Sequence, residues 1–131
     1  MKKDNMRRIS FLLVVLMILS FSSCSKVEVT DNEMIAVFRY GDIDISKPLS
    51  DEDTETIRAI FNGKSLFSDS PSCSFNENVA LIIDGNTYCI ACDTCGIVYI
   101  VEKDEYFSLT DKENGMVRDL LCEYGFIFPC L

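Results

Sequence analysis

The chain has 131 residues, of which 48% are hydrophobic and 25% charged, and its formal net charge is −9. It contains seven cysteines but neither histidine nor tryptophan. A chain of this length is expected to form one compact domain. Without histidine there is no Ser-His-Asp or Cys-His catalysis, no His-bearing zinc site and no haem held by histidine. The acidic balance argues against nucleic-acid binding, which needs Lys and Arg to neutralise phosphates.

The N-terminal segment combines a basic start with an apolar stretch. Lys2, Lys3, Arg7 and Arg8 precede residues 9–21, which carry no charge. As a helix this stretch would reach about 20 Å, which is too short for a hydrocarbon core of roughly 30 Å. A basic start followed by a short apolar stretch and small residues is typical of a secretory signal peptide.

The residues that follow the apolar stretch add a more specific signal. Phe21-Ser22-Ser23-Cys24 resembles the lipobox of bacterial lipoproteins, although leucine is commoner than phenylalanine at the first position. The resemblance implies that residues 1–23 are removed and that Cys24 carries a diacylglyceryl lipid. The protein is then expected at the outer face of the cell membrane, held there through this lipid. The alternative is an uncleaved membrane anchor in which Cys24 is an ordinary cysteine.

Removal of residues 1–23 makes the remaining chain more acidic. Four basic residues and one acidic residue leave with the signal peptide, so 8 Lys and Arg face 20 Asp and Glu, a net charge of −12. Residues 24–33 are expected to form a lipid-anchored tether, and residues 34–131 a single domain. If the domain has a protein partner, its charge favours one with a basic surface.

The first half of this domain predicts two strands, a helix and a loop. Residues 34–40 are β-branched and aromatic, and residues 42–46 alternate with the period of a half-buried strand. Ser50 is expected to cap a helix that ends at Phe61, with Asp53 reaching back toward the cap. Residues 64–78 are rich in Ser, Asn and Pro and predict a loop that holds Cys73.

The second half predicts a meander followed by a second helix. Four strands are expected, joined by an Asp84-Gly85-Asn86 turn, a turn at 93–96 and a charged turn at 103–105; they span residues 79–83, 87–92, 97–102 and 106–109. Thr110 and Glu113 form a capping box at the start of the second helix, and Gly125 is expected to end it. The fold class is therefore α+β, an antiparallel sheet of about four to six strands packed against two helices.

Three of the cysteines form a C-x2-C-x2-C pattern at Cys89, Cys92 and Cys95. A metal or cluster site would need a fourth ligand nearby, and Cys89 and Cys92 would point to opposite faces of a strand. A thioredoxin-like redox pair needs its first cysteine at a helix N-terminus, whereas Cys92 and Cys95 flank a hairpin turn that contains Asp93.

Disulfide bonds are the third interpretation, and the one that export favours. The six candidates are an even number: Cys73, Cys89, Cys92, Cys95, Cys122 and Cys130. We expect at least two bridges among them. Cys122 and Cys130 are near each other in sequence, and Cys73 could reach the turn that holds Cys95.

The sequence thus predicts a non-enzymatic binding or interaction module that is stabilised by disulfides. It predicts no catalytic residue, no metal ligand and no cofactor. The alternative is an extracytoplasmic thiol-redox or metal-handling protein that uses Cys89, Cys92 and Cys95.

Lipidation of Cys24 is directly testable. Metabolic labelling with radioactive palmitate should mark the wild-type protein and leave Cys24→Ala unmarked, because the substitution removes the acylated thiol. Equal labelling of the two proteins would rule the lipid anchor out.

Overall fold

A computed structural model describes residues 25–30 and 32–130, so the signal segment and Cys24 lie outside the described residues. Six strands form one antiparallel sheet in the order β2-β1-β3-β4-β5-β6. The strands are β1 (Met34–Tyr40), β2 (Ile43–Pro48), β3 (Val79–Ile83), β4 (Asn86–Ile90), β5 (Ile97–Ile100) and β6 (Glu105–Ser108). The predicted α+β class is confirmed.

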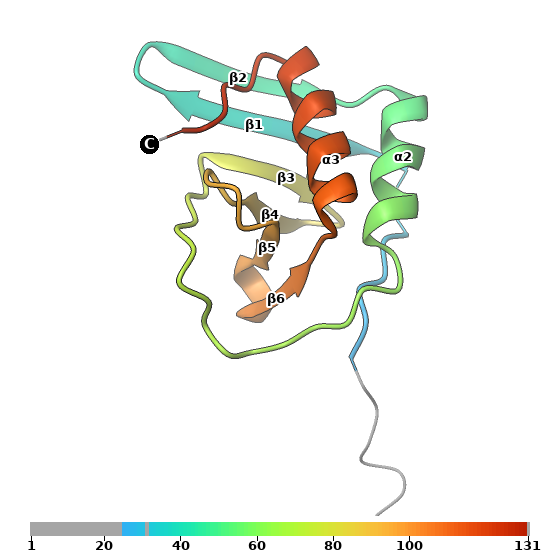
Figure 1. Ribbon diagram of the computed structural model, residues 1–131. Helices are drawn as coiled ribbons and strands as arrows, with labels where there is room; N and C mark the ends of the chain where they lie inside the picture. Colours follow the sequence, from blue (N-terminus) through green and yellow to red (C-terminus); the bar gives the residue numbers. More distant parts are fainter. Residues whose placement is uncertain (1–24, 31, 131) are drawn as a thin grey trace, which may run out of the picture.

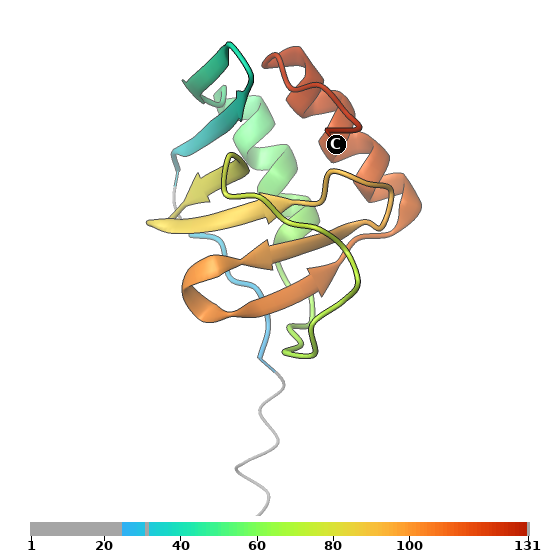
Figure 2. The same cartoon turned by 90° about the vertical axis from the view of Figure 1, so that its left-hand side faces the viewer.

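The sheet is covered differently on its two faces. Helices α2 (Asp51–Phe61) and α3 (Asp111–Glu123) lie side by side on one face (Figure 1). On the opposite face, the long loop at 62–78 crosses the sheet over its β5–β6 side (Figure 2). Phe67 of this loop stacks on Tyr106 with their ring centroids 5.7 Å apart, and the ring of Phe75 lies tilted against Tyr106 at 5.6 Å. The loop is therefore packed against the sheet by its own aromatic side chains.

The core lies between the sheet and the helices, and it follows the alternation of the strands. Met34, Ala36 and Phe38 are fully buried on β1, while the residues between them belong to the other face. Phe61 of α2 stacks on Tyr88 at 5.9 Å and meets the edge of Phe107 at 5.0 Å. Burial of these large rings supplies much of the apolar area removed from water.

The start of α2 is capped with the help of Tyr124, the residue that follows α3. The Ser50 hydroxyl accepts the Asp53 backbone N–H at 3.1 Å, as the sequence predicts. Asp53, however, does not accept the Ser50 N–H. The Tyr124 hydroxyl accepts that N–H at 2.9 Å and donates to Asp53 Oδ2 at 2.6 Å. An aspartate side chain is one methylene shorter than the glutamate of a full capping box, and the tyrosine spans the gap and ties the two helices together.

The start and end of α3 agree with the sequence. Glu113 Oε2 accepts the Thr110 N–H at 2.9 Å, and Thr110 Oγ1 accepts the Glu113 N–H at 3.2 Å. A hydrogen bond from Lys64 holds the pKa of Glu113 below its ordinary value, and the Thr110 N–H acts in the same direction. Gly125 ends the helix with φ +102°, and a Cβ there would lie 2.6 Å from Ile45 Cδ1. This position therefore requires glycine.

The first described residues differ from the predicted tether at 24–33. Val27 and Val29 are only 2% and 3% exposed and belong to the core. The backbone of Val27 exchanges hydrogen bonds of 2.9 Å with Gly63 and Lys64, and Ser25 O accepts the Leu66 N–H at 3.0 Å. The alternation of valines with polar residues here is too short to stand out as a strand. Val27 and Val29 are therefore part of the packed domain.

Several strand boundaries also differ from the prediction. β4 ends at Ile90, two residues early, so Cys92 lies in the turn at 91–96 rather than on the strand. β5 ends at Ile100 because a short helix η1 (Val101–Lys103) follows it. Among the described residues, no helix has both the length and the apolar character needed to cross a membrane.

The buried hydroxyl of Thr54 generates a stability prediction. Thr54 is 3% exposed, and its Oγ1 has no hydrogen-bond partner among the described residues. We expect Thr54→Val to raise the free energy of unfolding by about 1 kcal/mol, because it removes an unsatisfied buried polar group. The matched control is Thr56→Val, since Thr56 is a half-buried residue of the same helix whose hydroxyl does have a partner, Glu52 O, at 3.0 Å. Urea denaturation checks both, and a less stable Thr54→Val would contradict the account.

Candidate functional site

Four distant parts of the chain contact the turn at 91–96: the 62–78 loop, Leu109, Arg118 of α3 and the C-terminal tail. A disulfide joins Cys95 to Cys73 of the 62–78 loop, with Cα atoms 6.4 Å apart. A second disulfide joins Cys92 to Cys130 of the C-terminal tail, with Cα atoms 4.9 Å apart. Both Cα distances are within the range of about 4.4–6.8 Å found for disulfides. Two bridges are thus present, as the sequence predicts, and both converge on this one turn.

Hydrogen bonds fix the same turn from inside the fold. Asp93 Oδ1 accepts the Cys95 N–H at 2.9 Å, and Asp93 O accepts from Arg118 Nη1 of α3 at 2.9 Å. The Leu109 N–H donates to Gly96 O at 2.7 Å. The Arg118 guanidinium also lies 4.7 Å from the ring centroid of Phe128, so one side chain contacts both the turn and the tail.

The pairing of cysteines differs in part from the expectation. The proposed link between Cys73 and the turn at Cys95 is present. The proposed pair of Cys122 and Cys130 is wrong, because Cys130 is bonded to Cys92 and Cys122 is an exposed free thiol. Cys122 follows the buried Leu121 and points away from the core. The tail meanwhile turns back over the sheet, where Phe126 packs on Phe38 at 4.9 Å.

Cys89 has no disulfide partner and is 1% exposed. It lies on the sheet face opposite the helices, between Ala80 and Tyr99 on the neighbouring strands. Burial raises the pKa of its thiol to about 12, and the charges of Glu77 and Glu102 act in the same direction. A thiol with this pKa is almost entirely protonated at neutral pH, so Cys89 is a poor nucleophile and a poor metal ligand.

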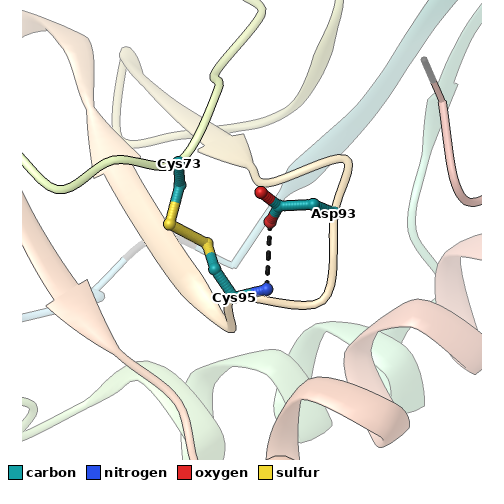
Figure 3. Close-up of side chains that lie close together, drawn as sticks. All are labelled: Cys73, Asp93 and Cys95. Atoms are coloured by element: carbon teal, nitrogen blue, oxygen red, sulfur yellow. Dashed lines mark hydrogen bonds between the residues drawn. A yellow bond between two sulfur atoms is a disulfide. The ribbon is translucent and has the colours of Figure 1, made fainter.

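The structure therefore does not bring Cys89, Cys92 and Cys95 to one point. Among the described residues, a different group has the geometry of a cation site: Cys73, Asp93 and Cys95, whose ligand atoms all lie within 4.8 Å of one another. Figure 3 shows the Asp93 carboxylate beside the disulfide that joins the two cysteines. Sequence spacing could not identify this group, because Cys73 lies 22 residues before Cys95.

A cavity of about 410 Å³ opens beside the turn. Its volume is in the range of about 300–1,000 Å³ that ligand pockets occupy. The walls combine aromatic rings, small polar groups, one carboxylate and the second disulfide: Tyr40, Ser74, Phe75, Asn76, Val79, Cys92, Asp93 and Cys130. Tyr40, at the end of β1, is 51% exposed and contributes to the lining of the cavity.

Two further surface cavities are weaker candidates for a binding site. One lies on the uncovered part of the sheet face and includes Ile35, Ile82 and Thr87. The other lies between the two helices, where Asp53, Asp119 and Glu123 surround Met116. Neither is bounded by a disulfide, and half of the residues that line the second are acidic.

Comparison with models of protein families, with curated proteins and with solved structures finds no significant match to this chain. The proposed function therefore depends on the geometry of the cavity and of the two disulfides. Sequence reasoning singles out the cysteines but not Tyr40, Phe75 or Arg118. Tyr40 and Phe75 carry no local signal, because an aromatic residue in a strand or loop is equally compatible with a core position.

Proposed function

We propose that this protein is a small exported lipoprotein, anchored through Cys24 at the outer face of the cell membrane. In this proposal it acts as a non-enzymatic binding module for a protein partner that presents basic side chains. The single observation that carries the proposal is the disulfide-bounded cavity beside the turn at 91–96.

The walls of the cavity suit recognition. Both the loop that carries Phe75 and the tail that carries Cys130 are covalently tied to the turn. A cavity held in this way loses little conformational entropy when a ligand enters, which favours affinity. Its polar groups are a phenol, a hydroxyl, an amide and a carboxylate, which can orient a ligand through hydrogen bonds.

The chemistry of the lining favours a cationic side chain. Two aromatic rings, Tyr40 and Phe75, share the cavity with the Asp93 carboxylate. An ammonium or guanidinium group is attracted both by aromatic faces and by a carboxylate. The net charge of −12 expected after removal of residues 1–23 also steers a basic partner toward the domain.

The position of the cavity fits a lipid anchor at Cys24. The first described residues leave the fold at one end, whereas the β1–β2 hairpin and the C-terminal tail lie at the other (Figures 1 and 2). Tyr40 ends β1 next to this hairpin, and Cys130 belongs to the tail. A lipid on Cys24 would leave the cavity facing away from the membrane.

The experiment uses the full chain in detergent and a short peptide that bears lysine and arginine. We expect the peptide to bind, with Tyr40→Ala and Asp93→Asn each weakening the affinity about tenfold, or about 1.4 kcal/mol. Asp93→Asn retains an oxygen that can accept the Cys95 N–H, so the turn is kept. Binding should weaken as the salt concentration rises. Isothermal titration calorimetry gives the affinities.

Two controls make the result specific. Met116→Ala changes an exposed apolar side chain of α3 outside the cavity and should bind the peptide like the wild type. A peptide of equal length that bears glutamate should not bind. The proposal fails if the wild type ignores the basic peptide, or if Tyr40→Ala and Asp93→Asn bind it as tightly as Met116→Ala.

A further inference from the structure

We propose that the protein has a second, redox-dependent state in which Cys73, Asp93 and Cys95 bind Zn²⁺. In the oxidised protein the two sulfurs are joined to each other. Once this disulfide is reduced, two thiolates and one carboxylate converge on the same point. This set of ligands suits zinc, which accepts sulfur and carboxylate oxygen and commonly leaves a fourth position for water.

The geometry of the group supports the assignment. The two sulfurs and a carboxylate oxygen all lie within 4.8 Å of one another. The Cα atoms of Cys73 and Cys95 are 6.4 Å apart, toward the wide end of the disulfide range of about 4.4–6.8 Å. The two sulfurs can therefore move apart and take an ion between them once their bond is broken. Asp93 accepts the Cys95 N–H through Oδ1, so the other carboxylate oxygen, Oδ2, can coordinate the ion.

Other contacts keep Cys73, Asp93 and Cys95 close together after the disulfide is reduced. The turn is still held by the Cys92–Cys130 bridge, by Arg118 on Asp93 O and by the Leu109 N–H on Gly96 O. The loop around Cys73 keeps its own contacts, because Phe75 packs on Tyr99 and Tyr106. Phe67 also exchanges two backbone hydrogen bonds with Tyr106, of 2.9 and 2.8 Å. Reduction therefore frees two thiols within an otherwise fixed frame.

The two disulfides differ in how far their cysteines are exposed to solvent. Cys95 is exposed and Cys73 is half-buried, whereas Cys92 is only 8% exposed. A reductant in solution thus reaches the Cys73–Cys95 bridge more readily. Asp93 also lines the 410 Å³ cavity, so the open coordination position would face a space that water can enter.

A dithiol can reduce the Cys73–Cys95 disulfide by thiol–disulfide exchange. The dithiol gives two electrons and two protons and becomes a disulfide, while the bond between the Cys73 and Cys95 sulfurs breaks and each sulfur becomes a thiol. Binding of Zn²⁺ then releases two protons, because only the thiolates coordinate the metal. Reoxidation by a disulfide reverses the exchange and expels the ion.

The test titrates the full chain in detergent with Co²⁺, which reports thiolate ligands through a charge-transfer absorption, and then displaces it with Zn²⁺. A phosphine opens the disulfide without adding a competing thiol, taking its oxygen from water. We expect one equivalent of Co²⁺ to bind the reduced protein and none to bind the oxidised protein. Cys73→Ser and Cys95→Ser should lose the absorption, and Asp93→Asn, which keeps both cysteines, should bind at least tenfold more weakly.

Cys122→Ser is the matched control, since it removes one exposed free thiol outside the proposed site and breaks neither disulfide. It should retain the absorption of the reduced wild type. The proposal is overturned if the reduced wild type shows no thiolate–cobalt absorption, or if the absorption survives in Cys73→Ser. It is equally overturned if Cys122→Ser abolishes the absorption, or if Asp93→Asn binds Co²⁺ as tightly as the wild type.

Discussion

Two covalent bonds hold the 62–78 loop and the C-terminal tail to the six residues at 91–96. Burial of apolar side chains assembles the sheet and the two helices without these bonds, and Phe67 and Phe75 pack the loop on the sheet. The two bridges add a covalent link from the loop and from the tail to the same turn. Each bridge restricts the unfolded chain and contributes about 2–4 kcal/mol. Because Arg118 contacts both the turn and the tail, the helix layer is joined to the same point.

This arrangement accounts for the cavity and for its chemistry. The loop, the tail and the end of β1 together form walls around about 410 Å³. The lining offers rings and a carboxylate to a ligand, whereas the thiol of Cys89 is buried and does not line the cavity. The proposed partner binding and the proposed zinc site share Asp93, so reduction of one disulfide would couple them.

The fold class could be predicted because the local signals agree with the global arrangement. Some features arise from residues that are close together in sequence: the alternating strands, the Asp-Gly turn and the Thr110–Glu113 capping box. The structure contains each of them. The burial of Val27 and Val29 could not be predicted, because it depends on a partner segment near Gly63. The same holds for the Cys92–Cys130 bridge and the Tyr124 cap. These contacts join residues far apart in sequence, and nothing in either local pattern identifies the other.

The central claim is the convergence of both disulfides on the turn at 91–96, and a peptide map of the unreduced protein tests it most directly. Free thiols are alkylated before and after unfolding, and the cross-linked peptides are then identified by mass spectrometry. The account predicts Cys73–Cys95 and Cys92–Cys130 links, alkylation of Cys122 in the folded protein, and alkylation of Cys89 only after unfolding, since burial raises its pKa to about 12. A Cys92–Cys95 or Cys122–Cys130 link would contradict it.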